Sequence, residues 1–157
     1  MIYTATFAAV AVTAAQDLFE IVAPSNSGIA IRKVVVGQYT DFGDAAAEIL
    51  SIQIIRGFTT SGSGGSTATP APVKGHTGAA TSTATVEINN TTVAQNGTGV
   101  VMIADSFNIA AGWVYEPPPD ERITIAPSGR LVVRITAPAD SITTNGTLIF
   151  EEIGQGG

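Results

Sequence analysis

Residues 122–137 have the sequence RITIAPSGRLVVRITA, in which two alternating runs, 122–126 and 130–137, flank the Pro-Ser-Gly at 127–129. In the second run the side chains divide between two faces: we expect Leu131, Val133 and Ile135 to point inward and Arg130, Arg134 and Thr136 outward. A period of two residues, bounded by turn residues, is typical of β-strands. The stretch therefore predicts a β-hairpin.

Similar short runs of Val, Ile, Thr, Phe and Tyr occur along the rest of the chain. They predict strands at 4–12, 18–23, 29–39, 50–56, 85–88, 100–104, 107–115 and 147–151. The phase of the third run slips at Arg32-Lys33, which predicts a β-bulge, and Asn145-Gly146 predicts a turn. Residues 42–50 are the one candidate for a helix, and it is short.

This pattern predicts a fold of the all-β class: a single-domain antiparallel sandwich over residues 1–157, jelly-roll-like, with eight or nine strands and at most one short helix. Residues 58–85, FTTSGSGGSTATPAPVKGHTGAATSTAT, interrupt it as a long Gly/Ser/Thr-rich loop. Such a segment has little apolar surface with which to offset its conformational entropy. We expect it to lie against another chain rather than against its own sheet.

Composition favours a protein that assembles. Hydrophobic residues make up 45% of the chain and charged residues 13%, so we expect apolar surface to be buried between subunits, although a surface of small Ala and Thr residues is the alternative. The formal net charge is −6 and the basic residues are scattered, which argues against nucleic acid as a partner. The uncharged stretch before Asp17 is too short and too polar to span a membrane.

Sites for chemistry are sparse. With no cysteine and one histidine, His76, the chain lacks the usual zinc ligands. Asp41 and Asp44 are the nearest carboxylate pair, but a turn or helix cap explains them better than a metal does. Asp120-Glu121 and Glu151-Glu152 have the pattern of surface charge. We expect no enzyme activity, no catalytic residue, no bound metal and no cofactor.

Two aromatic residues, Trp113 and Tyr115, fall on one face of a predicted strand. Such a pair can stack on a sugar ring, but more often it anchors a core or an interface. The candidates for interface contacts are Phe58, Lys74, His76, Trp113 and Tyr115.

Four phrases carry a resemblance to a known group of proteins: GSGGSTATPAP (62–72), VEINNTT (86–92), ADSFNIAAGWVYEPPPDERITIAPSGRLVVRITAPADS (104–141) and GTLIFEE (146–152). Together they resemble capsid decoration proteins, also called cement or head-stabilising proteins, of tailed bacteriophages. The resemblance implies a jelly-roll-like structural protein of the virion, made in the host cytoplasm. It would sit on the capsid surface as a homotrimer and bridge subunits of the major capsid protein. It implies no catalytic residue.

The alternative is a jelly-roll module that binds a carbohydrate or a receptor, in a head fibre or tail tip, with Trp113 and Tyr115 as the sugar platform. A minor capsid protein is a further possibility, and an enzyme is the most distant one.

Overall fold

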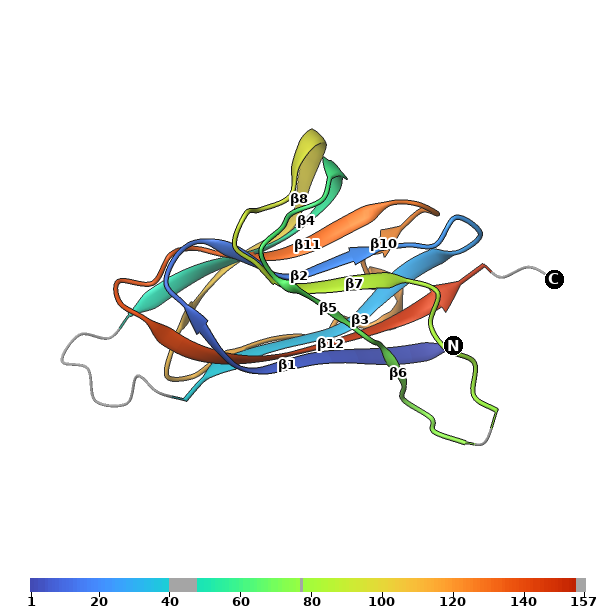
Figure 1. Cartoon of the computed structure of the whole chain (residues 1–157), viewed down its shortest axis with the longest axis horizontal. Helices are drawn as coiled ribbons and strands as arrows, with labels where there is room; N and C mark the ends of the chain where they lie inside the picture. The colour runs from blue at the N-terminus through green and yellow to red at the C-terminus, as the bar shows by residue number, and fades with distance from the viewer. Residues whose placement is uncertain (40–47, 77, 155–157) are drawn as a thin grey trace.

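The computed structural model describes residues 1–39, 48–76 and 78–154, which form two antiparallel sheets that enclose a core (Figure 1). Sheet A contains β1 (Ile2–Val12), β3 (Gly28–Gln38), β6 (Ala71–Pro72), β9 (Trp113–Tyr115), β10 (Thr124–Ile125) and β12 (Ile142–Ile153). Sheet B contains β2 (Gln16–Val22), β4 (Ile49–Thr60), β5 (Ser66–Ala68), β7 (Thr85–Asn90), β8 (Gln95–Asn108) and β11 (Arg130–Ile135). The one helical element in these ranges is the short 3-10 helix η1 (Pro119–Glu121). The prediction of an all-β sandwich is confirmed.

The strands pair as one long ribbon folded back on itself. β1 pairs with β12, β2 with β11, β3 with both β9 and β10, and β4 with β8. The ribbon is then rolled up, so that β12 also pairs with β3 and β11 with β4. Successive strands β1 to β4 therefore alternate between the sheets. Strands β5, β6 and β7 belong to an insertion between β4 and β8, the innermost pair of the ribbon.

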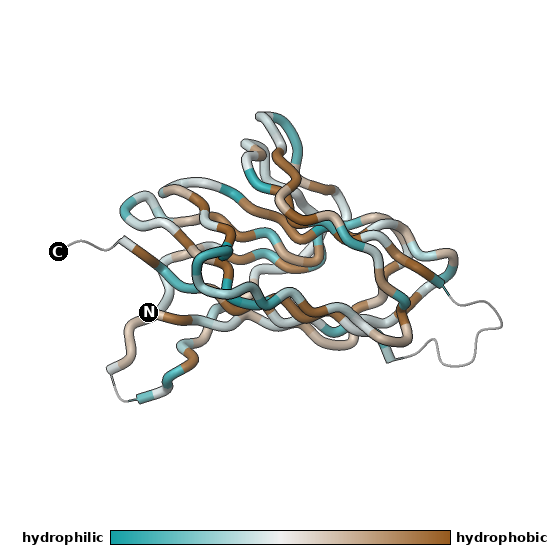
Figure 2. Tube along the Cα trace, turned by 180° about the vertical axis from the view of Figure 1, so that it is seen from behind, coloured by the Kyte–Doolittle hydropathy of each residue, from teal (hydrophilic) through white to brown (hydrophobic). Residues whose placement is uncertain are grey.

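Alternating side chains from both sheets form the core. Leu131, Val133 and Ile135 of β11 are buried, as their spacing predicts, and pack in one cluster with residues of β12 such as Leu148 and Phe150. Figure 2 shows the same pattern, with hydrophobic positions spread along the strands of both sheets. Burying apolar area at this interface supplies the main driving force for the fold.

The predicted hairpin at 122–137 is wrong, although both of its arms are extended. Thr124–Ile125 pairs with β3 in sheet A, whereas Arg130–Ile135 pairs with β2 and β4 in sheet B. The turn between them is tight, because the Gly129 N–H donates to the Ala126 carbonyl at 2.9 Å. It carries the chain from one layer to the other. Alternation of apolar and polar residues indicates that a segment is a half-buried strand, but it does not identify the neighbouring strand.

Other local predictions have mixed outcomes. The bulge in the third strand is confirmed: Lys33 pairs with Ile149 and Ile31 with Phe150, which leaves Arg32 as the extra residue. The predicted strands at 100–104 and 107–115 are instead one 14-residue strand, β8, and the separate short β9. Residues 40–47 lie outside the described residues, and with them Asp41, Asp44 and most of the predicted helix. Ile49 already belongs to β4.

The predicted turn at Asn145-Gly146 is also wrong, because β12 continues through both residues. The partner strand bulges instead: Ala9 has φ 56°, and its N–H donates to the Asn145 side-chain oxygen at 2.9 Å. A Cβ atom on Gly146 would lie 2.3 Å from the Phe7 ring and 3.0 Å from the Phe19 ring. The glycine therefore makes room for two core aromatic rings.

We predict that Gly146→Ala lowers the free energy of unfolding by about 1–3 kcal/mol, because the added methyl group overpacks the core. Gly37→Ala is the matched control: Gly37 is the neighbour of Asn145 on β3, and a Cβ there meets nothing within 4 Å. Urea unfolding measures both variants. Equal stability of the two would contradict the packing role of Gly146.

Candidate interaction surface

The five predicted interface residues do not come together. Phe58 packs beside Ile55, Ala94 and Val132 in a small cluster separate from the main core. Lys74 and His76 follow β6, at the edge of sheet A next to β1, whereas Trp113 and Tyr115 lie on β9, which pairs with β3. No single surface contains them all.

Trp113 and Tyr115 do share a face, with stacked rings whose centroids are 6.2 Å apart. Trp113 is only 6% exposed, and its indole N–H donates to Asp105 Oδ2 at 3.0 Å. This bond, together with one from the Ser106 backbone N–H, holds the pKa of Asp105 below its ordinary value. Burial raises the pKa of Tyr115. The tryptophan is thus an anchor between strands, and its face is not open to a sugar.

The low-complexity segment lies against its own sheets, so the expectation that it does not contact them is wrong. Ser66–Ala68 forms β5 and pairs with β7 in sheet B, and Ala71–Pro72 forms β6 and pairs with β1 in sheet A. Ser63 makes an isolated bridge to Thr92. The segment therefore crosses from one sheet to the other along one side of the sandwich.

A buried carboxylate holds the start of this segment. Glu20, on the outer face of β2, accepts hydrogen bonds from Ser61 Oγ at 2.8 Å and from the Gly62 backbone N–H at 2.9 Å. The Asn90 amide donates to the same carboxylate at 3.1 Å. Arg130 Nε lies 2.6 Å from Glu20 Oε1 without an aligned hydrogen bond, so that contact is an electrostatic one.

A second buried carboxylate holds the end of the segment. Glu152 is 9% exposed, and its Oε1 accepts from Ser82 Oγ at 2.7 Å, the Thr83 N–H at 2.9 Å and the Ala84 N–H at 3.1 Å. The prediction that Glu152 is ordinary surface charge is wrong. Its neighbour Glu151 does behave as such, in a partly exposed ion pair with Arg32.

A third carboxylate, Asp17, fixes the loop before β8. It forms a two-pronged ion pair with Arg134, at 2.7 and 3.1 Å, and accepts the Ala94 N–H at 2.7 Å. The Arg134 guanidinium also lies 4.9 Å from the centre of the Phe58 ring, which explains why Phe58 is partly buried on this face. A signal for these sites was available in the sequence of β2: Glu20 is a charge inside the apolar run 18–22, and Asp17 directly precedes that run.

Lys74 and His76 are exposed, and the His76 ring nitrogen Nδ1 lies 3.3 Å from the Lys74 carbonyl oxygen.

Among the residues that the structure describes, no group of three or more His, Cys, Asp or Glu side chains is placed to hold a metal ion. Nor does any helix in those ranges have the length and apolar character needed to cross a membrane.

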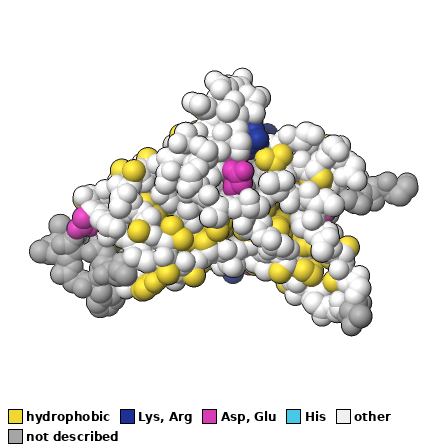
Figure 3. Space-filling model, in the orientation of Figure 1, with side chains coloured by type: hydrophobic (Ala, Val, Ile, Leu, Met, Phe, Trp, Pro, Cys, Tyr) yellow, Lys and Arg dark blue, Asp and Glu magenta, His cyan; other side chains and the backbone are white. Residues whose placement is uncertain are grey.

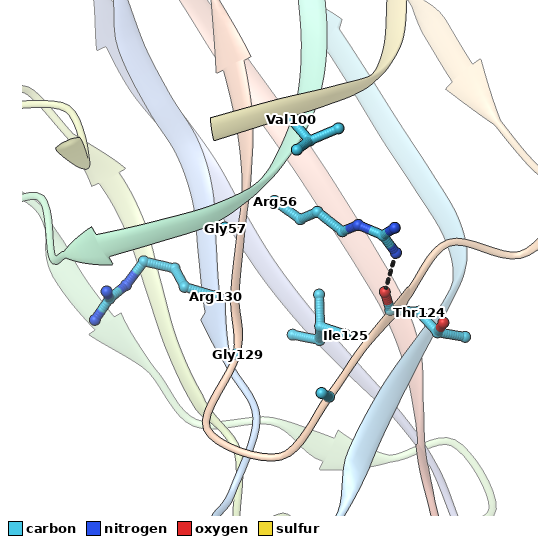
Figure 4. Close-up of a pocket in the computed structure, with 8 residues that line it drawn as sticks. Arg56, Gly57, Val100, Thr124, Ile125, Gly129 and Arg130 are labelled. Atoms are coloured by element: carbon cyan, nitrogen blue, oxygen red, sulfur yellow. Dashed lines mark hydrogen bonds between the residues drawn. The ribbon is translucent and has the colours of Figure 1, made fainter. Parts of the chain in front are cut away.

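A groove of about 410 Å³ lies on the opposite side of the sandwich from the segment, between β4 and β8 of sheet B and β10 of sheet A. Figure 4 shows Arg56 extending across it to the Thr124 carbonyl oxygen, at 2.8 Å, while Arg130 points away. Val100 and Ile125 form apolar parts of its lining. The one charged group that spans the groove is therefore already bonded to the protein.

Large apolar side chains are exposed at several edges: Met1, Tyr39, Ile49, Val73, Val100, Val101, Val114 and Ile153. Figure 3 shows how few charged side chains lie on one face of the molecule. Exposed apolar side chains are among the features that interaction surfaces have.

The chain matches no protein-family model, no curated protein and no solved structure.

We predict that Glu152→Ala lowers the free energy of unfolding by about 1.5–3 kcal/mol, since it removes the carboxylate that accepts from the Ser82 hydroxyl and from the Thr83 and Ala84 backbone N–H groups. Glu151→Ala is the matched control and should cost about 0–1 kcal/mol, the usual value of a partly exposed ion pair. Urea unfolding gives both values, and limited proteolysis should cut the Glu152 variant faster within residues 73–84. Similar losses in the two variants would rule out the anchoring role.

Proposed function

We propose that this chain is a structural virion protein that decorates and stabilises a bacteriophage capsid by bridging neighbouring capsid subunits. The observation that carries the proposal is a β-sandwich that exposes large apolar residues, such as Val73 and Val114, in a chain with few charges. The resemblance of its phrases to decoration proteins gives the partner, the major capsid protein. The site of action is the outer surface of the virion, after synthesis in the host cytoplasm.

The jelly-roll form of the sandwich belongs to this proposal. A jelly roll is a two-sheet sandwich of eight antiparallel strands wound as Greek keys. The nested pairs β1–β12, β2–β11, β3–β9/β10 and β4–β8, with alternation between sheets, support that assignment. Such a body presents its loops and edges at fixed positions, which a bridging protein requires.

We also propose that the protein acts as a homotrimer. Once one subunit has docked, the other two face their sites at high effective concentration, so modest contacts add up to firm attachment. A ligand that binds only the assembled lattice stabilises it by mass action. Sedimentation at micromolar concentration should give the mass of three chains, and a monomer with no larger species contradicts the trimer.

The test of decoration uses particles that lack the protein. These should assemble but burst at lower temperature or milder osmotic shock, and adding purified protein should restore their resistance. Because few charges are available for the contact, moderate salt should leave the protein bound, whereas denaturant should release it. Failure of the protein to bind particles, together with binding to a host glycan, would favour the alternative of a receptor-binding module.

A further inference from the structure

The groove between β10 and the β4–β8 pair carries positive charge only. Its lining includes two arginines, Arg56 and Arg130, and none of the described aspartates or glutamates. Arg130 points away from the groove (Figure 4) and pairs with Glu20. Arg56 spans the groove, but it takes part in none of the four ion pairs that the described residues form. Although the chain has thirteen acidic and seven basic residues, this cation lacks a counter-charge within the described ranges.

Arg56 has hydrogen-bonding capacity to spare. A guanidinium group has five N–H donors, and the bond that Arg56 makes within the described residues runs from Nη1 to the Thr124 carbonyl oxygen, at 2.8 Å. That acceptor is neutral, so it does not balance the charge. Carboxylates match the geometry of a guanidinium best. Val100, which is 46% exposed, adds apolar surface beside it. The groove therefore suits an occupant that has a carboxylate next to a short apolar segment.

The chain itself exposes a segment of this chemistry. Residues 116–121 have the sequence EPPPDE, in which Asp120 and Glu121 are exposed and belong to none of those four ion pairs, whereas Glu116 pairs with Lys33. The prolines fix the backbone before any partner arrives: Pro118 has φ −60° and ψ 160°, close to polyproline II. A segment that is already stiff loses little conformational entropy when it binds.

We propose that residues 116–121 of one copy of this chain dock in the groove of the next copy. The prolines lie against the apolar lining at Val100, and the carboxylates of Asp120 and Glu121 pair with Arg56. None of residues 116–121 lines the groove of its own chain, so the groove is open to the segment of another copy. The contact is head-to-tail, because it joins two different surfaces of the same chain.

The places of the two surfaces favour a closed ring. The segment connects β9 with β10, which both pair with β3 at one end of sheet A, and the groove lies beside β10 and the β8 end of sheet B. Both surfaces are therefore on the side of the sandwich away from β5 and β6. A straight filament uses opposite sides of a subunit, whereas in a ring of three each subunit meets its neighbours in directions about 60° apart. The inference rests on the proposed homotrimer and names the contact that closes it.

Charge reversal tests this contact. Arg56→Glu should raise the dissociation constant of the trimer at least about 100-fold, because it places like charges face to face. Asp120→Lys together with Glu121→Lys should do the same from the other surface. A chain that carries all three substitutions should form trimers again, since the ion pair returns with its polarity inverted. Sedimentation equilibrium over a series of concentrations measures all of these variants.

Lys74→Glu is the matched control, because it changes the net charge by the same amount as Arg56→Glu, at an exposed residue after β6. It should leave the trimer unchanged. Thermal unfolding verifies that each variant is folded. If Arg56→Glu does not fold, Arg56→Gln takes its place, and loss of the charge alone should weaken the trimer at least about tenfold.

The proposal is overturned if the trimer persists in the charge-reversed variants, if the combined variant associates no better than its parents, or if Lys74→Glu weakens the trimer equally. A wild-type chain that is a monomer at every concentration contradicts the homotrimer as well. A trimer that responds to these substitutions as expected but does not bind particles contradicts capsid decoration alone.

Discussion

The buried carboxylates of Asp17, Glu20 and Glu152 need hydrogen-bond donors, and the position of the surrounding loop residues depends on that need. An ionised carboxylate inside a protein costs several kcal/mol unless donors surround it. Here the donors come largely from backbone N–H groups and hydroxyls of residues 61–62, 82–84 and 94. A segment of Gly, Ser, Thr and Ala has few apolar side chains to bury, but its donors suffice to fix both of its ends. Hydrogen bonds to buried carboxylates thus hold the two ends of a segment that has too few apolar side chains to be held by hydrophobic burial.

The nested ribbon makes the fold depend on contacts between distant parts of the chain. β1 pairs with β12 over nearly its whole length, so sheet A is complete only when both ends of the described chain are in place. Long-range pairing of this kind carries a large loop-closure entropy and folds slowly. Register is then set by special residues: Gly146 admits the Phe7 ring, and the bulges at Ala9 and Arg32 return side chains to the correct face.

Sequence periodicity was enough to predict the all-β class, most strands and the bulge at Arg32, because half-buried strands leave a local pattern. It could not identify neighbours: the turn at 127–129 fits a hairpin and a crossover between sheets equally well. The turn predicted from Asn-Gly at 145–146 was wrong for the same reason. The glycine is needed there to make room for the ring of Phe7, a residue far away in sequence. Of the candidate site, the anchoring role of Trp113 was foreseen as the commoner alternative. The role of Glu152 was not foreseen, because the burial of its side-chain carboxylate depends on where residues 82–84 lie in the fold.

The position of the insertion decides which side of the sandwich the chain itself covers. Between β4 and β8, the innermost pair of the ribbon, chain can be added without disturbing any outer pair. The inserted segment adds β7 and β5 to one end of sheet B and β6 to the end of sheet A beside β1, and so covers part of that side of the sandwich. The opposite side has no such cover in the described ranges: there β8 remains open beside the groove that Arg56 spans. One side of the sandwich is thus partly covered by its own chain, whereas on the other side the outer edge of β8 pairs with no strand of the described residues.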